Sequence, residues 1–192
     1  MPGTAPAVDT ERESLLAYLR QQRDGLRYAA FGLTDDQLRL KPTRSALSVG
    51  GLIKHAIHTE SSWVDTMLAR GGEMDEQGYV DTFSLGDDET VASLLADVEQ
   101  AARRTEEVVD GLDDLGARVQ LPDGPWFPQN PDGFSMRWIL LHVLEELARH
   151  AGHADIIREH IDGATMYELM AGAEGWPETD WVKPWRPEGA VR

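Results

Sequence analysis

The longest helical pattern in the sequence runs from Ser135 to Gly163, and it limits the fold more than any other feature. At about 100° per residue, its regularly spaced apolar residues fall on one side of an α-helix. These residues are Leu140, Val143, Leu144, Leu147, Ala151 and Ala154. That side should face the centre of a bundle of helices.

Three further segments have the same character. Thr10 and Glu13 fit a capping box at the start of a helix that continues to Gly32. Ser48 can cap a second helix running to about Arg70, and residues 88–112 form a third amphipathic pattern. Short helical turns are expected near "LTDDQLRLKP" and "TMYELMAG", whereas no strand-like alternation is seen. The sequence therefore predicts an all-α four-helix bundle with long crossover connections.

The chain divides into three parts. Residues 1–9 are small and Pro-rich, and should form a flexible N-terminus. Residues 10–171 should form the bundle. Residues 172–192 form a Pro-broken tail with three tryptophans, which should pack on the bundle or on a partner subunit in a homodimer.

The composition excludes several classes of protein. Lys and Arg number 18 against 34 Asp and Glu, a net charge of −16 that repels nucleic acids and anionic membranes. The apolar runs are shorter than the roughly 20 residues of a membrane span, and the N-terminus does not resemble a signal peptide. We therefore expect a cytoplasmic protein. Without cysteine, the chain has no thiol nucleophile, disulfide or thiolate metal ligand of its own.

Glu146 and His150 are unusual because they lie in or beside the apolar side of the longest helix. They are one helical turn apart and separated by roughly 40° around the axis, so their side chains can converge. Burying a carboxylate and an imidazole costs free energy unless each has a hydrogen-bonding, ionic or metal partner. They either form an ion pair or bind a metal ion.

The helix after Ser48 offers a third ligand. His55 lies at the flank of its apolar face, whereas His58 has polar neighbours and should face solvent. One histidine from this helix and a Glu–His pair from the longest one would leave coordination positions for water or substrate. A dinuclear site is disfavoured, because ferritin-like bundles need Glu-x-x-His on two helices. The zincin motif H-E-x-x-H is absent.

The segments "SMRWILLHVLEELARHAGHADIIREHIDG" and "LSVGGLIKHAIHTESSW" resemble the DinB-like superfamily. The resemblance spans about Leu15 to Met170 and is to an actinobacterial branch related to mycothiol-dependent maleylpyruvate isomerase. It implies an up-down-down-up four-helix bundle with one divalent metal and no DNA binding. Many members have His-x-x-x-His on the last helix, but this chain resembles the branch with a His, Glu, His set. The implied ligands are His55, Glu146 and His150.

Four other residues are candidates for supporting roles. His153 stands where many relatives have glutamine, so the resemblance implies a hydrogen bond to the ligands rather than a fourth ligand. His142 either hydrogen-bonds to the ligands or is an ordinary boundary histidine. Arg149 either forms an exposed ion pair with Glu145 or meets an anionic substrate. Trp126, in the Pro- and Gly-rich loop, either covers the site or fills the end of the bundle.

The resemblance implies a metal-activated thiol, such as mycothiol, acting on a small electrophile in S-transfer or isomerisation. His and carboxylate ligands suit zinc, nickel and iron alike, and we favour zinc because it is the most frequent metal at such sites. The same ligands could support hydrolysis by water. The sequence is also compatible with a non-catalytic metal-binding bundle in a stress response, and with a metal-free interaction bundle.

Overall fold

The computed structural model describes residues 3–72, 76–121, 130 and 132–187, and it is mainly helical. The helices are α1 (Glu11–Ala30), α2 (Asp35–Leu38), α3 (Val49–Met67), α4 (Glu76–Asp81), α5 (Val91–Asp110), α6 (Met136–Asp162) and α7 (Met166–Ala173). The predicted all-α fold is confirmed. A two-stranded antiparallel ribbon, β1 (Arg118–Val119) with β2 (Phe134–Ser135), was not predicted and precedes α6.

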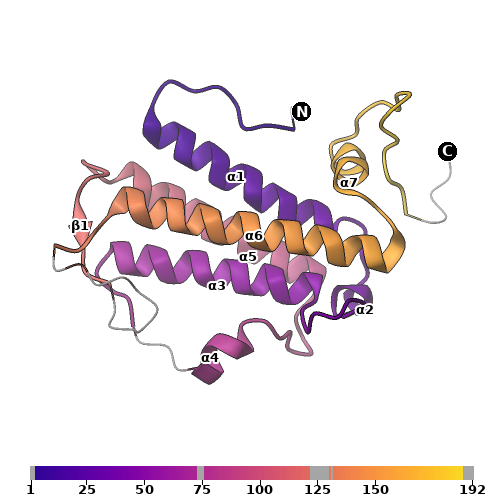
Figure 1. The fold of residues 1–192 in the computed structure, drawn as a ribbon, viewed down its shortest axis with the longest axis horizontal. Coiled ribbons are helices and arrows are strands. Elements are labelled where there is room, and N and C mark those ends of the chain that lie inside the picture. The colour runs from indigo at the N-terminus through magenta and orange to yellow at the C-terminus, as the bar shows by residue number, and fades with distance from the viewer. Residues whose placement is uncertain (1–2, 73–75, 122–129, 131, 188–192) are drawn as a thin grey trace.

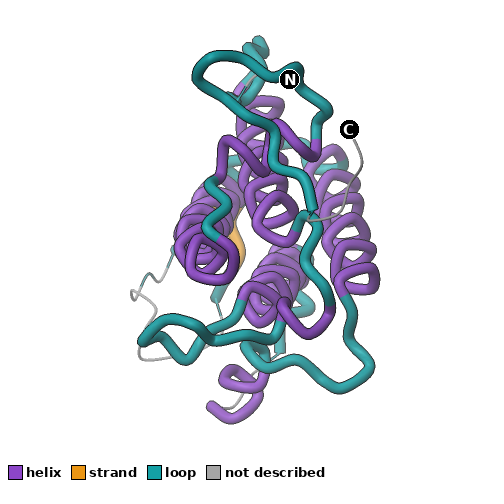
Figure 2. Tube along the Cα trace, turned by 90° about the vertical axis from the view of Figure 1, so that its right-hand side faces the viewer, coloured by secondary structure: helices purple, strands orange, loops and turns teal. Residues whose placement is uncertain are grey.

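The four long helices lie side by side. Helix α6 packs on α1 and α3, and α5 packs on α3 and α1. Figure 1 shows α1 and α6 running in one direction and α3 and α5 in the other. The view in Figure 2 shows the long helices gathered around a common centre, with α4 outside them. In Figure 1, α4 lies next to α3, on the side away from α1.

The helix ends follow the capping residues in the sequence. The hydroxyl of Thr10 accepts a hydrogen bond from the backbone of Glu13, whose carboxylate accepts one in return. At the starts of α3 and α6, the side chains of Ser48 and Ser135 accept hydrogen bonds from the backbones of Gly51 and Trp138. Helix α6 ends at Gly163, whose φ of 77° lies in the left-handed region. The two serine caps fix where α3 and α6 begin.

The predicted apolar side of α6 faces the core. Leu140, Val143, Leu147, Ala151 and Ala154 are buried, and Leu144 is partly buried against them. Sequence periodicity therefore identified correctly which side of α6 is inside.

A buried ion pair joins three of the long helices. Arg23 on α1 donates from Nε to Oε2 of Glu60 on α3 at 3.0 Å, and from Nη2 to Oε1. The hydroxyl of Thr105 on α5 also donates to Glu60. Arg23 and Glu60 are only 4% and 2% exposed. The two charges are therefore almost fully removed from water, and each is stabilised by the opposite charge of its partner.

The C-terminal segment contacts the end of the bundle. The backbone of Trp185 donates to the carbonyl of Glu168 at 2.8 Å. Its indole ring meets Phe31 edge to face, and the guanidinium of Arg158 lies 4.7 Å from its centre. Trp181, in contrast, is 87% exposed. The homodimer and the limits of the three parts of the chain, which we predicted from the sequence, stay predictions.

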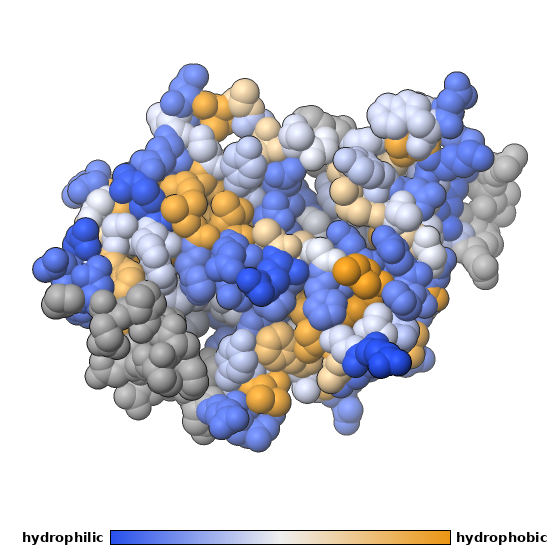
Figure 3. Space-filling view, in the orientation of Figure 1, coloured by the Kyte–Doolittle hydropathy of each residue, from blue (hydrophilic) through white to orange (hydrophobic). Residues whose placement is uncertain are grey.

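The face of the molecule drawn in Figure 3 is mainly hydrophilic. On the face drawn in Figure 3, apolar residues form small separate groups among polar ones. No described helix has both the length and the apolarity needed to cross a bilayer.

We expect Asp155→Asn to stabilise the protein above pH 7. Oδ1 of Asp155 on α6 is buried without a hydrogen-bond partner within the described residues. Burial raises the pKa of Asp155 to about 6. Between about pH 4 and 6, the folded protein therefore keeps a proton on Asp155 that the unfolded chain, with a pKa of about 4, has lost. The stability of the folded protein falls as the pH rises through this range.

Asparagine carries no charge, so the variant avoids this loss. After allowance for solvent screening, we expect a gain of about 1 kcal/mol at pH 8 and a smaller one at pH 4.5. Urea denaturation of both proteins at the two pH values measures the difference. An equal effect at both values would show that the charge is not the cause.

Candidate metal centre

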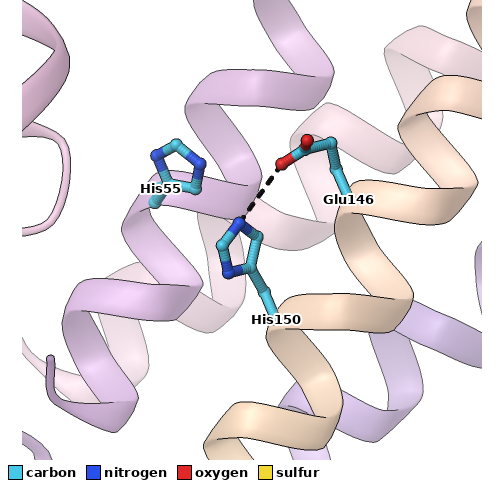
Figure 4. A group of neighbouring side chains, drawn as sticks. All are labelled: His55, Glu146 and His150. Atoms are coloured by element: carbon cyan, nitrogen blue, oxygen red, sulfur yellow. Dashed lines mark hydrogen bonds and ion pairs between the residues drawn. The ribbon is translucent and has the colours of Figure 1, made fainter. Parts of the chain in front are cut away.

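Three of the predicted site residues meet between α3 and α6. His55 comes from α3, and Glu146 and His150 come from α6, one turn apart (Figure 4). One potential ligand atom from each lies within 4.8 Å of the others. Nε2 of His150 is 3.2 Å from Oε2 of Glu146. The centres of the two imidazole rings are 4.7 Å apart, and the rings are nearly perpendicular. The structure thus brings the three residues into one cluster, the triad.

Burial and nearby groups give His55 and Glu146 protonation states suited to metal binding. His55 is 1% exposed, and burial, followed by the nearby His150, lowers its pKa to about 4. The hydrogen bond with His150 lowers the pKa of Glu146. At neutral pH, His55 is therefore a neutral imidazole with one nitrogen lone pair, and Glu146 is a carboxylate.

The spacing of the donors fits a single ion. Ligands about 2.0–2.2 Å from tetrahedral zinc are roughly 3.4 Å apart. The His150–Glu146 distance of 3.2 Å matches this spacing, and the upper limit of 4.8 Å for the whole triad is somewhat wider. Side-chain rotation would bring the wider pairs together. Two imidazole nitrogens and one carboxylate oxygen form a donor set that zinc, nickel and iron all accept.

Sequence reasoning missed a segment that covers His55. We call residues 79–83 the cover segment. The ring of Phe83 stacks on the imidazole of His55 with centres 3.8 Å apart, and Tyr79 meets the same ring edge to face at 5.4 Å. The hydroxyl of Thr82 lies 2.8 Å from Nδ1 of His55. The connection between α3 and α5, to which the sequence analysis gave no role, therefore forms part of the candidate site.

Gly51 of α3 allows the cover segment to lie so close, and Gly50 leaves room for two leucine side chains outside that segment. A Cβ atom at Gly51 would overlap the backbone carbonyl of Phe83, and one at Gly50 would overlap the side chains of Leu85 and Leu38. Paired glycines inside an otherwise apolar helix are the sequence signal for such an approach.

A second group overlaps the triad. His142, Glu145 and Glu146 also have potential ligand atoms within 4.8 Å of one another. Nδ1 of His142 is 3.4 Å from Glu145, and its ring stacks on Trp138 and meets Trp63 edge to face. The side chain of Glu145 is 54% exposed. The triad is the more enclosed of the two groups.

Two other predicted site residues, His153 and Arg149, show no hydrogen bond or ion pair to the triad within the described part of the chain. His153 is partly buried and, within the described parts of the chain, makes no hydrogen bond to the three residues. Arg149 is 71% exposed at its side chain and pairs with Glu145 at 3.1 Å. Trp126 lies outside the described residues. The supporting roles of these three stay predictions.

His58 differs from the expectation. We predicted a solvated side chain, but His58 is partly buried, and its Nε2 has no hydrogen-bond partner among the residues described. Burial lowers its pKa. The prediction failed because polar neighbours on the same helix did not indicate what packs against that side.

Comparison with known families agrees with this geometry. Residues 14–163 match the family model described as mycothiol-S-transferase. The chain therefore belongs to the mycothiol S-transferase family, which is DinB-like, and the predicted resemblance is confirmed. Membership fits a thiol cosubstrate and small-molecule substrates.

The similarity to a solved structure supports the fold alone. No curated protein matches significantly. The crystal structure of a conserved protein from Enterococcus faecalis is similar to this one with a TM-score of 0.59 and 12% identity. The match covers 82% of this chain and 100% of that one.

Proposed function

We propose that this protein is a metal-dependent mycothiol S-transferase that joins the sulfur of the thiol to a small electrophile. Two observations support the proposal: the family match over residues 14–163 and the triad of His55, Glu146 and His150. The four long helices would form the family's up-down-down-up bundle in residues 10–171, in a cytoplasmic protein.

The triad residues would act as the ligands. A divalent ion held by them, zinc in preference to nickel or iron, would lower the pKa of a bound thiol and so would favour the thiolate at neutral pH. Glu146 supplies the one negative charge, and His55 supplies a neutral nitrogen because of its lowered pKa. The chain contains no cysteine, so the reacting sulfur must come from a cosubstrate.

The surroundings of the triad favour entry of a small molecule from the side of α4. Tyr79 contacts His55 yet is 53% exposed, so its ring lies at the boundary between the site and solvent. Burial raises its pKa and the charge of Glu146 raises it further. Its hydroxyl therefore stays protonated at neutral pH and can donate a hydrogen bond to a substrate.

A conjugation assay tests this function. Zinc-loaded protein is incubated with mycothiol and 1-chloro-2,4-dinitrobenzene. In the reaction the thiol proton passes to buffer, a carbon–sulfur bond forms and chloride leaves. We expect the thioether to form faster than without protein, and His150→Ala to abolish the acceleration. A rate equal to the uncatalysed one with this and other alkylating or arylating electrophiles would contradict the proposal.

Replacing mycothiol with glutathione at the same concentration tests the cosubstrate. We expect a much lower rate, since the proposal assigns the thiol by family membership. Equal rates would show that the site does not distinguish the two thiols.

A further inference from the structure

We propose that two threonines act in opposite directions on His55: Thr82 fixes the tautomer that leaves Nε2 free to bind the metal, and Thr59 competes with the metal for that nitrogen. This inference rests on the proposed metal site. It assigns positioning roles to two residues that do not belong to the triad.

The hydrogen bonds of Thr82 determine the tautomer. Its Oγ1 lies 2.6 Å from the backbone carbonyl of Tyr79, which can only accept, so the single hydroxyl proton of Thr82 points there. The same Oγ1 is 2.8 Å from Nδ1 of His55. Since Thr82 has no second proton, it must accept here, and Nδ1 of His55 must carry the hydrogen. In the neutral ring, Nε2 then holds the lone pair.

Thr82 is held firmly enough for this role. It is only 7% exposed. Phe83, the next residue, stacks on the ring of His55. The backbone carbonyl of Phe83 lies against Gly51, which is on α3 like His55. The imidazole is therefore fixed by stacking on one side and by a hydrogen bond at Nδ1. Partners of this kind commonly change metal affinity by about 10–100-fold when they are removed.

Thr59 faces the other nitrogen. It lies one turn after His55 on α3, and its Oγ1 is 3.2 Å from Nε2. Because that nitrogen holds the lone pair, Thr59 must be the donor. A metal ion needs the same lone pair, so the Thr59 hydrogen bond has to break before His55 can bind the ion. This hydrogen bond satisfies the buried nitrogen in the metal-free protein and lowers metal affinity.

Zinc affinities of the full-length variants test both roles. Competition with a chromophoric chelator is measured for the native protein, Thr82→Val, Thr82→Ser and Thr59→Val. We expect Thr82→Val to bind about 10–100-fold more weakly, because valine keeps the shape but cannot accept a hydrogen bond. Thr82→Ser keeps the hydroxyl and should bind as the native protein does. Thr59→Val should bind about fivefold more tightly.

Direct detection of the tautomer tests the same inference without metal. In nitrogen-15 spectra of the metal-free native protein, His55 should carry its proton on Nδ1. Protonation on Nε2, native affinity in a folded Thr82→Val protein, or weaker binding by Thr59→Val would overturn the proposal. The spectra of native protein decide the question if a variant does not fold.

These results separate the inference from the proposed function. If the zinc affinities follow the predicted order but the protein does not transfer the thiol, the proposed S-transferase activity is refuted and the proposed roles of Thr82 and Thr59 stand. If the protein transfers the thiol but Thr82→Val binds zinc with native affinity, the proposed activity stands and the proposed role of Thr82 is refuted.

Discussion

Arg23→Met should lower the free energy of unfolding by about 3–5 kcal/mol, because it leaves the carboxylate of Glu60 buried without its cation. Glu60 is 2% exposed, and its remaining donor in the cluster is the hydroxyl of Thr105. A neutral hydroxyl cannot replace the charge and the two hydrogen bonds that Arg23 supplies. Urea denaturation measures the loss.

Arg20→Met is the matched control. Arg20 lies one turn earlier on α1 and pairs with Glu106 at 2.9 Å, but its side chain is 63% exposed. This pair should contribute less than about 1 kcal/mol. The double variant Arg23→Met/Glu60→Leu should recover most of the stability lost in Arg23→Met, since neither charge is left alone. Equal losses in Arg20→Met and Arg23→Met would show that burial of the pair has no consequence.

His150→Ala should weaken zinc binding more than the roughly 10–100-fold expected for a residue that only supports a ligand. It removes one of two imidazoles in the triad and also the hydrogen bond of Glu146. For the native protein, free zinc at a hundred times its dissociation constant should add about 2.7 kcal/mol to the free energy of unfolding. The variant should gain almost nothing at that concentration.

Thermal unfolding with and without zinc measures this difference. His160→Ala is the control, because His160 lies on the same helix, is exposed and bonds to the backbone of Ile156. It should respond to zinc as the native protein does. An equal zinc response in His150→Ala would mean that the ion binds elsewhere.

Local patterns in the sequence predicted the four long helices and part of the candidate site. Thr10, Ser48 and Ser135 identified helix starts because capping depends on residues only a few positions away. Glu146 and His150 could be paired from spacing alone, since one turn of a helix brings them together. The all-α class followed from the same periodicity.

Contacts between distant segments could not be predicted in this way. Arg23 meets Glu60 across two helices, and no local pattern connects them. The cover segment was missed for the same reason, because Thr82 and Phe83 reach His55 only after the chain turns back past α4. His55 itself could be chosen over His58 only by a modest difference in periodicity and by family resemblance.

The most direct test of the metal centre is the metal content per chain, measured by mass spectrometry on protein purified without a metal-affinity tag. We predict about one equivalent in the native protein and nearly none in Glu146→Ala or His150→Ala. A native protein that stays empty after incubation with zinc, nickel and iron, or variants that keep the full content, would contradict the assignment of the triad as a metal centre.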